Sequence, residues 1–232
     1  MTDSPLISCL CVTHHKPDML KRAICCFHNQ DYLNKQMVIV YEESDLKTHE
    51  FITLHKFEDN IKIVNIKADI KLTLGELRNI SVRKADGSFV CQWDDDDWYN
   101  DDRLTEQMKW LSLSGKLGCV LSRWIVFDAC SQIAYLSFKK RWEGSILCQR
   151  DLMLQTPYPP LPKDEDTEVI ELLYKQGALS VIDDMPHLYV YIFHGNNTWD
   201  DEHFKEIIDH CHELSASYTK DIIEVLAASE CL

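Results

Sequence analysis

The first hundred residues alternate short apolar runs with helical patterns, and this alternation limits the fold more than any other feature. Apolar runs of strand length lie at residues 7–12, 37–41, 61–66 and 88–93. Helical patterns follow the first and third runs, one starting at Pro17 and one covering 74–84. Continuous apolar strands are typical of a sheet that is covered on both faces. The sequence therefore predicts an α/β fold with a mostly parallel central sheet flanked by helices.

The second half of the chain has weaker signals. We predict strands over 119–127, 133–138 and 188–193, a helix over 167–176, and a loop over 142–162 that is rich in proline at its end. The tail from residue 200 is expected to be helical. Its apolar stripe favours packing on the domain, and a dimer interface or a membrane surface is left as an alternative.

Length and composition indicate one globular domain. The 232 residues are 45% hydrophobic, and no apolar run approaches the roughly 18 residues that suggest a membrane span. We predict a single domain over 1–232, made of two halves (6–100 and 101–199) and the tail (200–232). The net charge of −14 argues against a nucleic-acid partner, because an acidic surface repels phosphate backbones.

The cysteines and residues 1–5 indicate the cellular compartment in which the protein is expected. No pair of the 10 cysteines has the C-x-x-C spacing of a zinc ribbon. Residues 1–5 lack the basic and apolar regions of a secretory leader, so we expect a cytoplasmic protein, with peripheral contact at the inner face of a membrane left open. Seven cysteines lie in apolar runs, which favours buried, reduced thiols: Cys9, Cys11, Cys25, Cys26, Cys91, Cys119 and Cys148.

Four consecutive aspartates follow the run at 88–93, and six aspartates lie within residues 94–102. Adjacent carboxylates repel one another unless a cation neutralises them. Mg²⁺ and Mn²⁺ prefer oxygen ligands, and in an extended segment Asp94 and Asp96 share a face. Ligands of parallel sheets bind beyond the carboxyl ends of the strands, where this cluster lies. The sequence therefore favours a divalent-metal site, with a solvated acidic loop as the alternative.

The segment 75–97 contains Gly75, Arg78-Asn79, Ala85-Asp86-Gly87 and Asp94-Asp95-Asp96-Asp97 in that order. This pattern resembles the central signature of family 2 glycosyltransferases. The resemblance extends over about residues 6–200 and implies the GT-A fold, a nucleotide-diphospho-sugar donor and Mn²⁺ or Mg²⁺. It also implies inverting transfer, most often from a UDP-sugar, to a hydroxyl of a glycan or lipid-linked acceptor.

The resemblance assigns roles on the donor side. Residues 6–100 become the nucleotide-binding half. The metal would be held by Asp96, with Asp94 and His194. Glu42 departs from the family pattern, because Glu42-Glu43-Ser44-Asp45 stands where Asp-Asp-Gly-Ser is usual. Contacts to the nucleotide are expected from Thr13, His14, Glu42, Arg78, Asp94 and Asp95.

On the acceptor side, residues 101–199 would hold the catalytic base. Asp166 is the first choice for the base and Glu165 the second, since a carboxylate can take the proton of the attacking hydroxyl. Acidic residues also favour helix N-termini, which is the alternative explanation here. Trp98 and Trp142 would be platforms for a sugar ring, with core packing as an equal alternative.

Two other classes of function remain as alternatives. A sugar-nucleotide nucleotidyltransferase shares this kind of sheet, but it normally begins with a glycine-rich loop, and residues 13–17 contain no glycine. A non-catalytic module that binds nucleotide or glycan would keep the fold and need neither Asp96 nor Asp166. A homodimer is compatible with either class.

Overall fold

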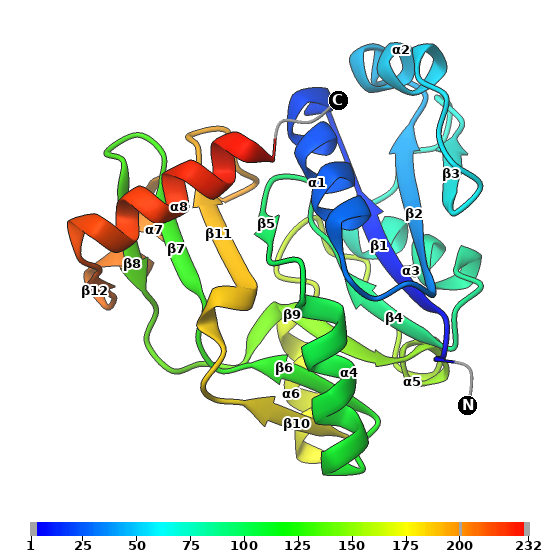
Figure 1. The fold of residues 1–232 in the computed structure, drawn as a ribbon. Coiled ribbons are helices and arrows are strands. Elements are labelled where there is room, and N and C mark those ends of the chain that lie inside the picture. Colours follow the sequence, from blue (N-terminus) through cyan, green and yellow to red (C-terminus); the bar gives the residue numbers. More distant parts are fainter. Residues whose placement is uncertain (1–3, 200, 230–232) are drawn as a thin grey trace.

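The computed structural model describes residues 4–199 and 201–229. Within these residues the chain forms a seven-stranded sheet and a five-stranded sheet, with helices against their faces (Figure 1). The predicted α/β architecture is confirmed. The ends of the predicted domain and the first residue of the predicted tail lie outside the described residues.

The large sheet is parallel except for one strand. Its order is β10-β6-β9-β4-β1-β2-β3, and β9 runs antiparallel to both neighbours. The register places Cys9 of the central strand opposite Met37 on one side and Cys91 on the other. The strands are β1 (Ile7–Val12), β2 (Lys35–Glu42), β3 (Ile61–Ile66), β4 (Phe89–Gln92), β6 (Gly118–Leu121), β9 (Trp142–Gln149) and β10 (Leu179–Ile182).

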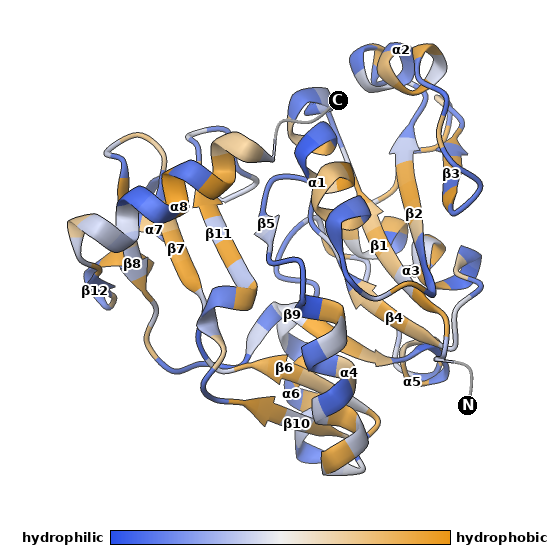
Figure 2. Cartoon of the chain, in the orientation of Figure 1, coloured by the Kyte–Doolittle hydropathy of each residue, from blue (hydrophilic) through white to orange (hydrophobic). Residues whose placement is uncertain are grey.

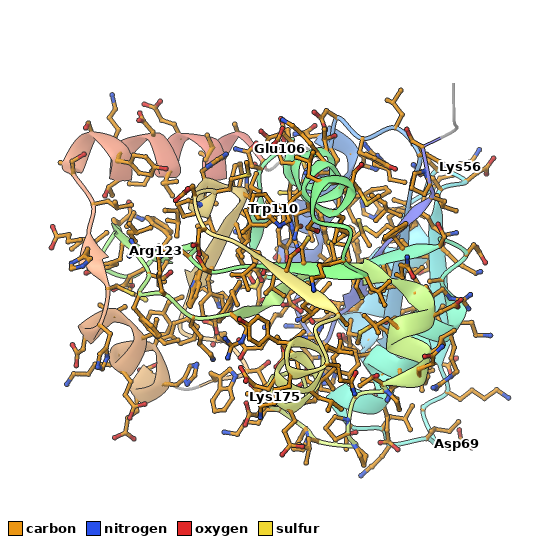
Figure 3. The ribbon with its side chains drawn as sticks, turned by 90° about the horizontal axis from the view of Figure 1, so that it is seen from below. Lys56, Asp69, Glu106, Trp110, Arg123 and Lys175 are labelled. Carbon is orange, nitrogen blue, oxygen red and sulfur yellow. The ribbon has the colours of Figure 1, made fainter. Side chains whose placement is uncertain are left out.

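Helices cover this sheet on both faces. Figure 2 shows apolar residues concentrated on the central strands, while the outer sides of the helices are polar. At the β10 end, α4 and α6 lie on opposite faces, as the labels Trp110 and Lys175 show (Figure 3). The helices are α1 (Pro17–Asn29), α2 (Leu46–Leu54), α3 (Leu74–Lys84), α4 (Arg103–Ser114), α5 (Arg150–Gln155) and α6 (Thr167–Lys175).

The second sheet has the order β12-β8-β7-β11-β5, and the tail helices α7 (Asp201–Asp209) and α8 (Ala216–Ala228) pack on it. Phe204 of α7 stacks on Tyr191, and Thr219 of α8 accepts a hydrogen bond from the backbone of Ala134. The predicted packing of the tail on the domain is confirmed. The strands are β5 (Trp98–Tyr99), β7 (Ile125–Asp128), β8 (Ile133–Leu136), β11 (Tyr189–Phe193) and β12 (His212–Glu213).

Two predictions for the second half are wrong. The strand expected over 119–127 is two strands, β6 and β7, in different sheets, because the backbone at Trp124 leaves the first sheet and bonds Ser137 Oγ at 2.9 Å. The loop expected over 142–162 begins with β9, which inserts between β4 and β6. No described helix is long and apolar enough to cross a membrane.

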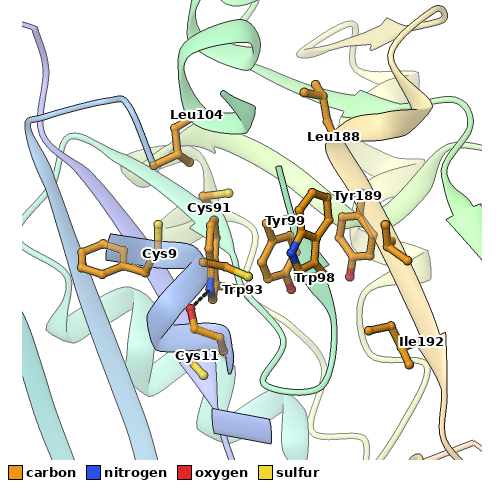
Figure 4. Close-up of a cluster of buried hydrophobic side chains, with 14 of the residues drawn as sticks. Cys9, Cys11, Cys91, Trp93, Trp98, Tyr99, Leu104, Leu188, Tyr189 and Ile192 are labelled. Atoms are coloured by element: carbon orange, nitrogen blue, oxygen red, sulfur yellow. Dashed lines mark hydrogen bonds between the residues drawn. The ribbon is translucent and has the colours of Figure 1, made fainter. Parts of the chain in front are cut away.

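An aromatic cluster joins the two sheets next to the acidic segment. Trp93 packs on Tyr99 with ring centroids 4.0 Å apart, and its Nε1 donates to the backbone oxygen of Ala23 at 3.0 Å (Figure 4). Tyr99 meets Tyr189 edge to face at 5.1 Å. The end of β4 and the start of β11 are therefore held together by buried rings.

The seven cysteines predicted to be buried are all buried. Six of them are free thiols: Cys9, Cys11, Cys26, Cys91, Cys119 and Cys148. Cys25 is disulfide-bonded, so the expectation of a reduced thiol is wrong at that position.

Candidate active site

Two adjoining cavities open at the carboxyl ends of β1, β2 and β4. The larger, of about 730 Å³, lies between the loop after β1 and the start of α3. The smaller, of about 170 Å³, lies between the acidic segment and the start of α6. The described residues that line both cavities are Val12, Lys16, Leu74, Asp95, Asn197 and Thr198.

The four aspartates have four different surroundings. Asp94 Oδ1 lies 2.9 Å from Arg78 Nη2, and its Oδ2 accepts a hydrogen bond from Gln92 Nε2 at 3.1 Å. Asp97 is buried and accepts hydrogen bonds from the Tyr189 hydroxyl and, at 3.0 Å, from the backbone N–H of Ile192. Asp97 thereby ties the acidic segment to β11.

The carboxylate of Asp96 has two basic partners on one oxygen. Its Oδ2 lies 2.5 Å from Lys16 Nζ and 3.3 Å from His194 Nε2. The structure therefore brings His194, at the end of β11, to the predicted metal carboxylate. Burial acts to raise the pKa of Asp96, but the hydrogen bond from His194 and the Lys16 ammonium outweigh it and hold that pKa well below its usual value.

Asp95 is buried between the two cavities. Neither its Oδ2 nor the buried Oγ1 of Thr13 makes a hydrogen bond of standard geometry, although the Thr13 hydroxyl lies close enough to the carboxylate to act to lower the pKa of Asp95. Burial, reinforced by the charge of Asp96, raises the pKa of Asp95 to about 7. Buried polar atoms without partners are costly, and they suit a site that a polar ligand completes.

Arg78 links the acidic segment to the start of α6. Its Nε lies 2.5 Å from Glu165 Oε1, while Nη2 reaches Asp94, and all three side chains are largely buried. Asp166 stands beside this pair and lines the smaller cavity. It occupies the N-cap position of α6 without making a capping hydrogen bond, and Gln92 Nε2 donates to its Oδ2 at 3.5 Å. Burial is the main cause that raises the pKa of Asp166 to about 7, and Arg78 acts in the opposite direction.

The loop before Glu165 is fastened to α3. Asn79 Nδ2 donates to the backbone oxygen of Tyr158 at 2.8 Å, and the Tyr158 N–H donates back to Asn79 Oδ1 at 2.9 Å. The Gly75 N–H donates to the oxygen of Leu161 at 3.1 Å. A Cβ on Gly75 would lie 1.9 Å from the oxygen of Pro159, so glycine is required for this close approach. Gly75 and Asn79 therefore position the two acidic residues that follow the loop.

The larger cavity gathers the residues predicted to contact a nucleotide. Thr13, His14 and Glu42 line it, and His14 Nδ1 lies 3.6 Å from Glu42 Oε2. Arg78 and Asp94 line the smaller cavity instead, and Asp95 lines both. The side chains assigned to the nucleotide therefore divide between the two cavities.

Asp45 is a residue that the sequence motifs did not single out. It is fully buried, its Oδ2 accepts from the backbone N–H of His15 at 2.5 Å, and its Oδ1 lies 2.9 Å from His15 Nδ1. His15 has a positive φ of 59°, which this contact stabilises. Asp45 also caps α2 through the N–H of Thr48. An aspartate before a helical pattern is an N-cap signal, and that signal identifies Asp45 in retrospect.

Comparison with known proteins identifies the family. A sequence model described as glycosyl transferase family 2 matches residues 8–160, which is more than half of the chain. The chain belongs to glycosyl transferase family 2. An uncharacterized glycosyltransferase of Methanocaldococcus jannaschii is 29% identical over 126 residues, covering 54% of this chain and 43% of that protein. The chain thus spans less than half the length of this relative.

Solved structures show the same fold for this family 2 chain. TarS 1–349 of S. aureus in complex with UDP-GlcNAc superimposes with a TM-score of 0.66 at 14% identity, covering 97% of this chain and 72% of that one. The mannosyltransferase PcManGT from Pyrobaculum calidifontis in complex with GDP-Man and Mn²⁺ gives a TM-score of 0.61 at 15% identity, covering 83% and 57%. The predicted GT-A fold is confirmed.

The two tryptophans predicted to form platforms differ in position in this family 2 chain. Trp142 lines the smaller cavity and stacks on Trp124 with centroids 4.2 Å apart. Trp98 is 8% exposed, lies in the core cluster of Figure 4 and donates from Nε1 to Ser229 Oγ at 2.8 Å. Because β5 pairs with β11 and packs against α1, the Trp98 side chain is directed into the core. The acceptor role predicted for Trp98 is therefore not supported.

Proposed function

We propose that this chain is a metal-assisted, inverting glycosyltransferase that moves a sugar from a UDP-sugar to a hydroxyl of a glycan or lipid-linked acceptor. The observation that carries this proposal is the presence of Asp96 and Asp166 on one small cavity that adjoins a larger, nucleotide-sized one. Membership in the family supports it. So do the neighbours of the same fold, whose complexes contain UDP-GlcNAc or GDP-Man with Mn²⁺.

The larger cavity is proposed to hold the nucleotide. Thr13 and Asp95 line it with oxygens that lack a hydrogen bond of standard geometry, and Glu42 offers a carboxylate to the base or the ribose. The phosphates and the sugar would then extend past Lys16 into the smaller cavity, which Arg78 and Asp94 line.

The donor set near Asp96 fits a metal shared with the donor. Asp96 Oδ2 and His194 Nε2 are 3.3 Å apart; the carboxylate oxygen suits Mn²⁺ or Mg²⁺, and an imidazole nitrogen beside it favours Mn²⁺ of the two. Among the described residues, no group of three or more His, Cys, Asp or Glu side chains is arranged to hold an ion. The remaining ligands would come from the diphosphate, from water and from Asp94. A bound metal would stabilise the negative charge of the leaving nucleotide diphosphate.

Asp166 is proposed as the catalytic base. The acceptor hydroxyl loses its proton as it attacks the anomeric carbon, and the Asp166 carboxylate, without a capping bond, is free to accept it. A single in-line displacement inverts the anomeric centre. Glu165 is held by Arg78 and positions the loop, while Trp142 offers an indole to the acceptor sugar ring.

Donor turnover is the direct test. With UDP-, GDP- and dTDP-sugars, we expect one UDP-sugar to release UDP in the presence of Mn²⁺ and not with chelator. Asp96→Asn should lower this rate by about 10²-fold or more, because the metal loses a negatively charged carboxylate ligand. Asp59→Asn, which changes an exposed aspartate remote from both cavities, is the matched control.

Two outcomes would contradict this assignment. If chelator and Asp96→Asn both left the rate of UDP release equal to that of wild type with Mn²⁺, the metal would have no place in the proposal. Binding of UDP with Mn²⁺ but no transfer to any glycan acceptor would favour the non-catalytic binding module.

The pH profile tests Asp166 independently. Since burial raises its pKa to about 7, the fraction of ionised base falls as the pH drops below that value. We expect kcat/KM to fall about tenfold per pH unit below pH 7 and to level off above it. Initial rates between pH 5.5 and 8.5 would measure this. The same inflection should persist in Asp95→Asn, and a flat profile would exclude Asp166 as the group that titrates.

A further inference from the structure

Lys16 lies where the two cavities meet. Its Nζ is 2.5 Å from Asp96 Oδ2, and the two side chains are only 17% and 13% exposed. Among the described residues that line both cavities, Lys16 is the only cation. It is the N-cap residue of α1 and precedes Pro17, whose ring fixes the backbone there, while the lysine side chain itself has four rotatable bonds.

The oxygen that Lys16 contacts is the one proposed to bind the metal. His194 Nε2 lies against the same oxygen, and Arg22 Nη2 donates to the backbone oxygen of Asp96 at 2.6 Å. A divalent ion binds a carboxylate oxygen at about 2.0–2.2 Å. An ammonium at hydrogen-bond distance from that oxygen therefore blocks the ion by both volume and charge.

The other cations of the smaller cavity are held elsewhere. Arg78 is paired with Asp94 and Glu165, Lys140 Nζ lies 3.0 Å from Glu143, and Lys163 Nζ lies 4.3 Å from the Trp199 ring. Arg78 is held by two carboxylates, whereas the ion pair of Lys16 is with Asp96 alone, the carboxylate proposed as the main metal ligand.

We propose that Lys16 is a positioning residue whose ammonium changes its partner: it leaves the Asp96 carboxylate and binds the diphosphate of the donor. Without donor, Lys16 neutralises Asp96 and keeps divalent ions away. When a nucleotide diphosphate enters the larger cavity, Lys16 Nζ donates to a phosphate oxygen, and Asp96 is released toward the metal. Metal and nucleotide diphosphate then bind together, with reciprocal coupling of their affinities. This inference rests on the proposed function.

Binding measurements with Lys16→Met test the exchange without an activity assay. In the nucleotide-free protein, we expect Mn²⁺ to bind about tenfold more tightly to the variant than to wild type, because Asp96 is no longer neutralised. With chelator present, UDP should bind the variant about tenfold more weakly, because the phosphate contact is lost. Titration calorimetry with UDP and with GDP, and the spin-resonance signal of free Mn²⁺, give both affinities.

Matched variants separate charge from position. Lys109→Met removes the same charge from the exposed side of α4, where Lys109 pairs with Glu106 and lines neither cavity, and it should change neither affinity. Lys16→Arg keeps the charge and should restore metal exclusion. Thermal unfolding of each variant checks that it is folded.

The outcomes distinguish this inference from the proposed function. Unchanged Mn²⁺ affinity in Lys16→Met, with wild type binding Mn²⁺ and nucleotide together, overturns the inference alone. Tighter Mn²⁺ binding with unchanged UDP binding in chelator overturns the transfer of Lys16 to the diphosphate. Wild type that binds neither UDP nor GDP in the presence of Mn²⁺ overturns the proposed function as well.

Discussion

Replacing Asp166 by asparagine is expected to lower kcat by about 10²–10⁴-fold, because the amide cannot take the proton of the acceptor hydroxyl. The affinity for nucleotide diphosphate should stay close to that of wild type, since the proposed partner of Asp166 is the acceptor hydroxyl and the base and ribose are expected in the larger cavity, which Asp166 does not line. Single-turnover transfer and calorimetric binding of UDP with Mn²⁺ would measure the two quantities. Glu168→Gln, which changes an exposed residue in the first turn of α6, is the matched control.

The stability of the Asp166→Asn variant separates lost chemistry from lost structure. Folding raises the pKa of Asp166 above its unfolded value, so the ionised carboxylate is disfavoured in the fold. Its contribution to stability is therefore present at low pH and is lost as the pH rises through about 7. At pH 8 the variant should unfold at a higher temperature than wild type. Unchanged turnover in a stable variant would exclude Asp166 as the base.

Replacing Arg78 by methionine is expected to reduce the free energy of unfolding by about 3–5 kcal/mol, because two largely buried carboxylates lose their shared cation. Glu165 is only 2% exposed, so water cannot replace the guanidinium at Nε. Transfer activity should fall as well, since Glu165 and Asp94 position the two sides of the smaller cavity. Urea unfolding followed by circular dichroism would measure the loss.

Two variants control this prediction. Arg141 pairs with Glu171 at about one third exposure, so Arg141→Met should cost less than about 1 kcal/mol. The double variant Arg78→Met, Glu165→Gln should recover part of the lost stability, because one unpaired charge is removed. A cost for Arg78→Met no larger than that of Arg141→Met would show that the buried pairs contribute little.

The first half of the fold was accessible from the sequence because its central strands, β1 and β2, are buried on both faces and are marked by continuous apolar runs. The run at 7–12 matches β1 residue for residue, and the run at 37–41 lies inside β2. The run at 61–66 matches β3 as well, although β3 is an edge strand that is only partly buried. The second half was predicted less well, since β9 inserts antiparallel between β4 and β6 and no local pattern specifies a partner so distant in sequence.

The candidate site was also predicted only in part: the motifs identified its residues but not their contacts. Asp94, Asp96 and Asp166 were selected from their motifs, and the structure gathers all three on one cavity. The motifs did not indicate what each carboxylate contacts. The pairing of Arg78 with Glu165 spans 87 residues, and that of Lys16 with Asp96 spans 80.

The sequence by itself therefore determined which residues are available at the strand ends and to which family the chain belongs. Apolar periodicity and motif spacing are local properties, so the chain displays them before it folds. Only the tertiary structure decided that Trp98 enters the core, that Asp45 supports the loop at His15, and that Lys16 neutralises Asp96. These contacts depend on the distances between elements far apart in the chain, and the physical reason is that packing of both sheets, not local preference, sets those distances.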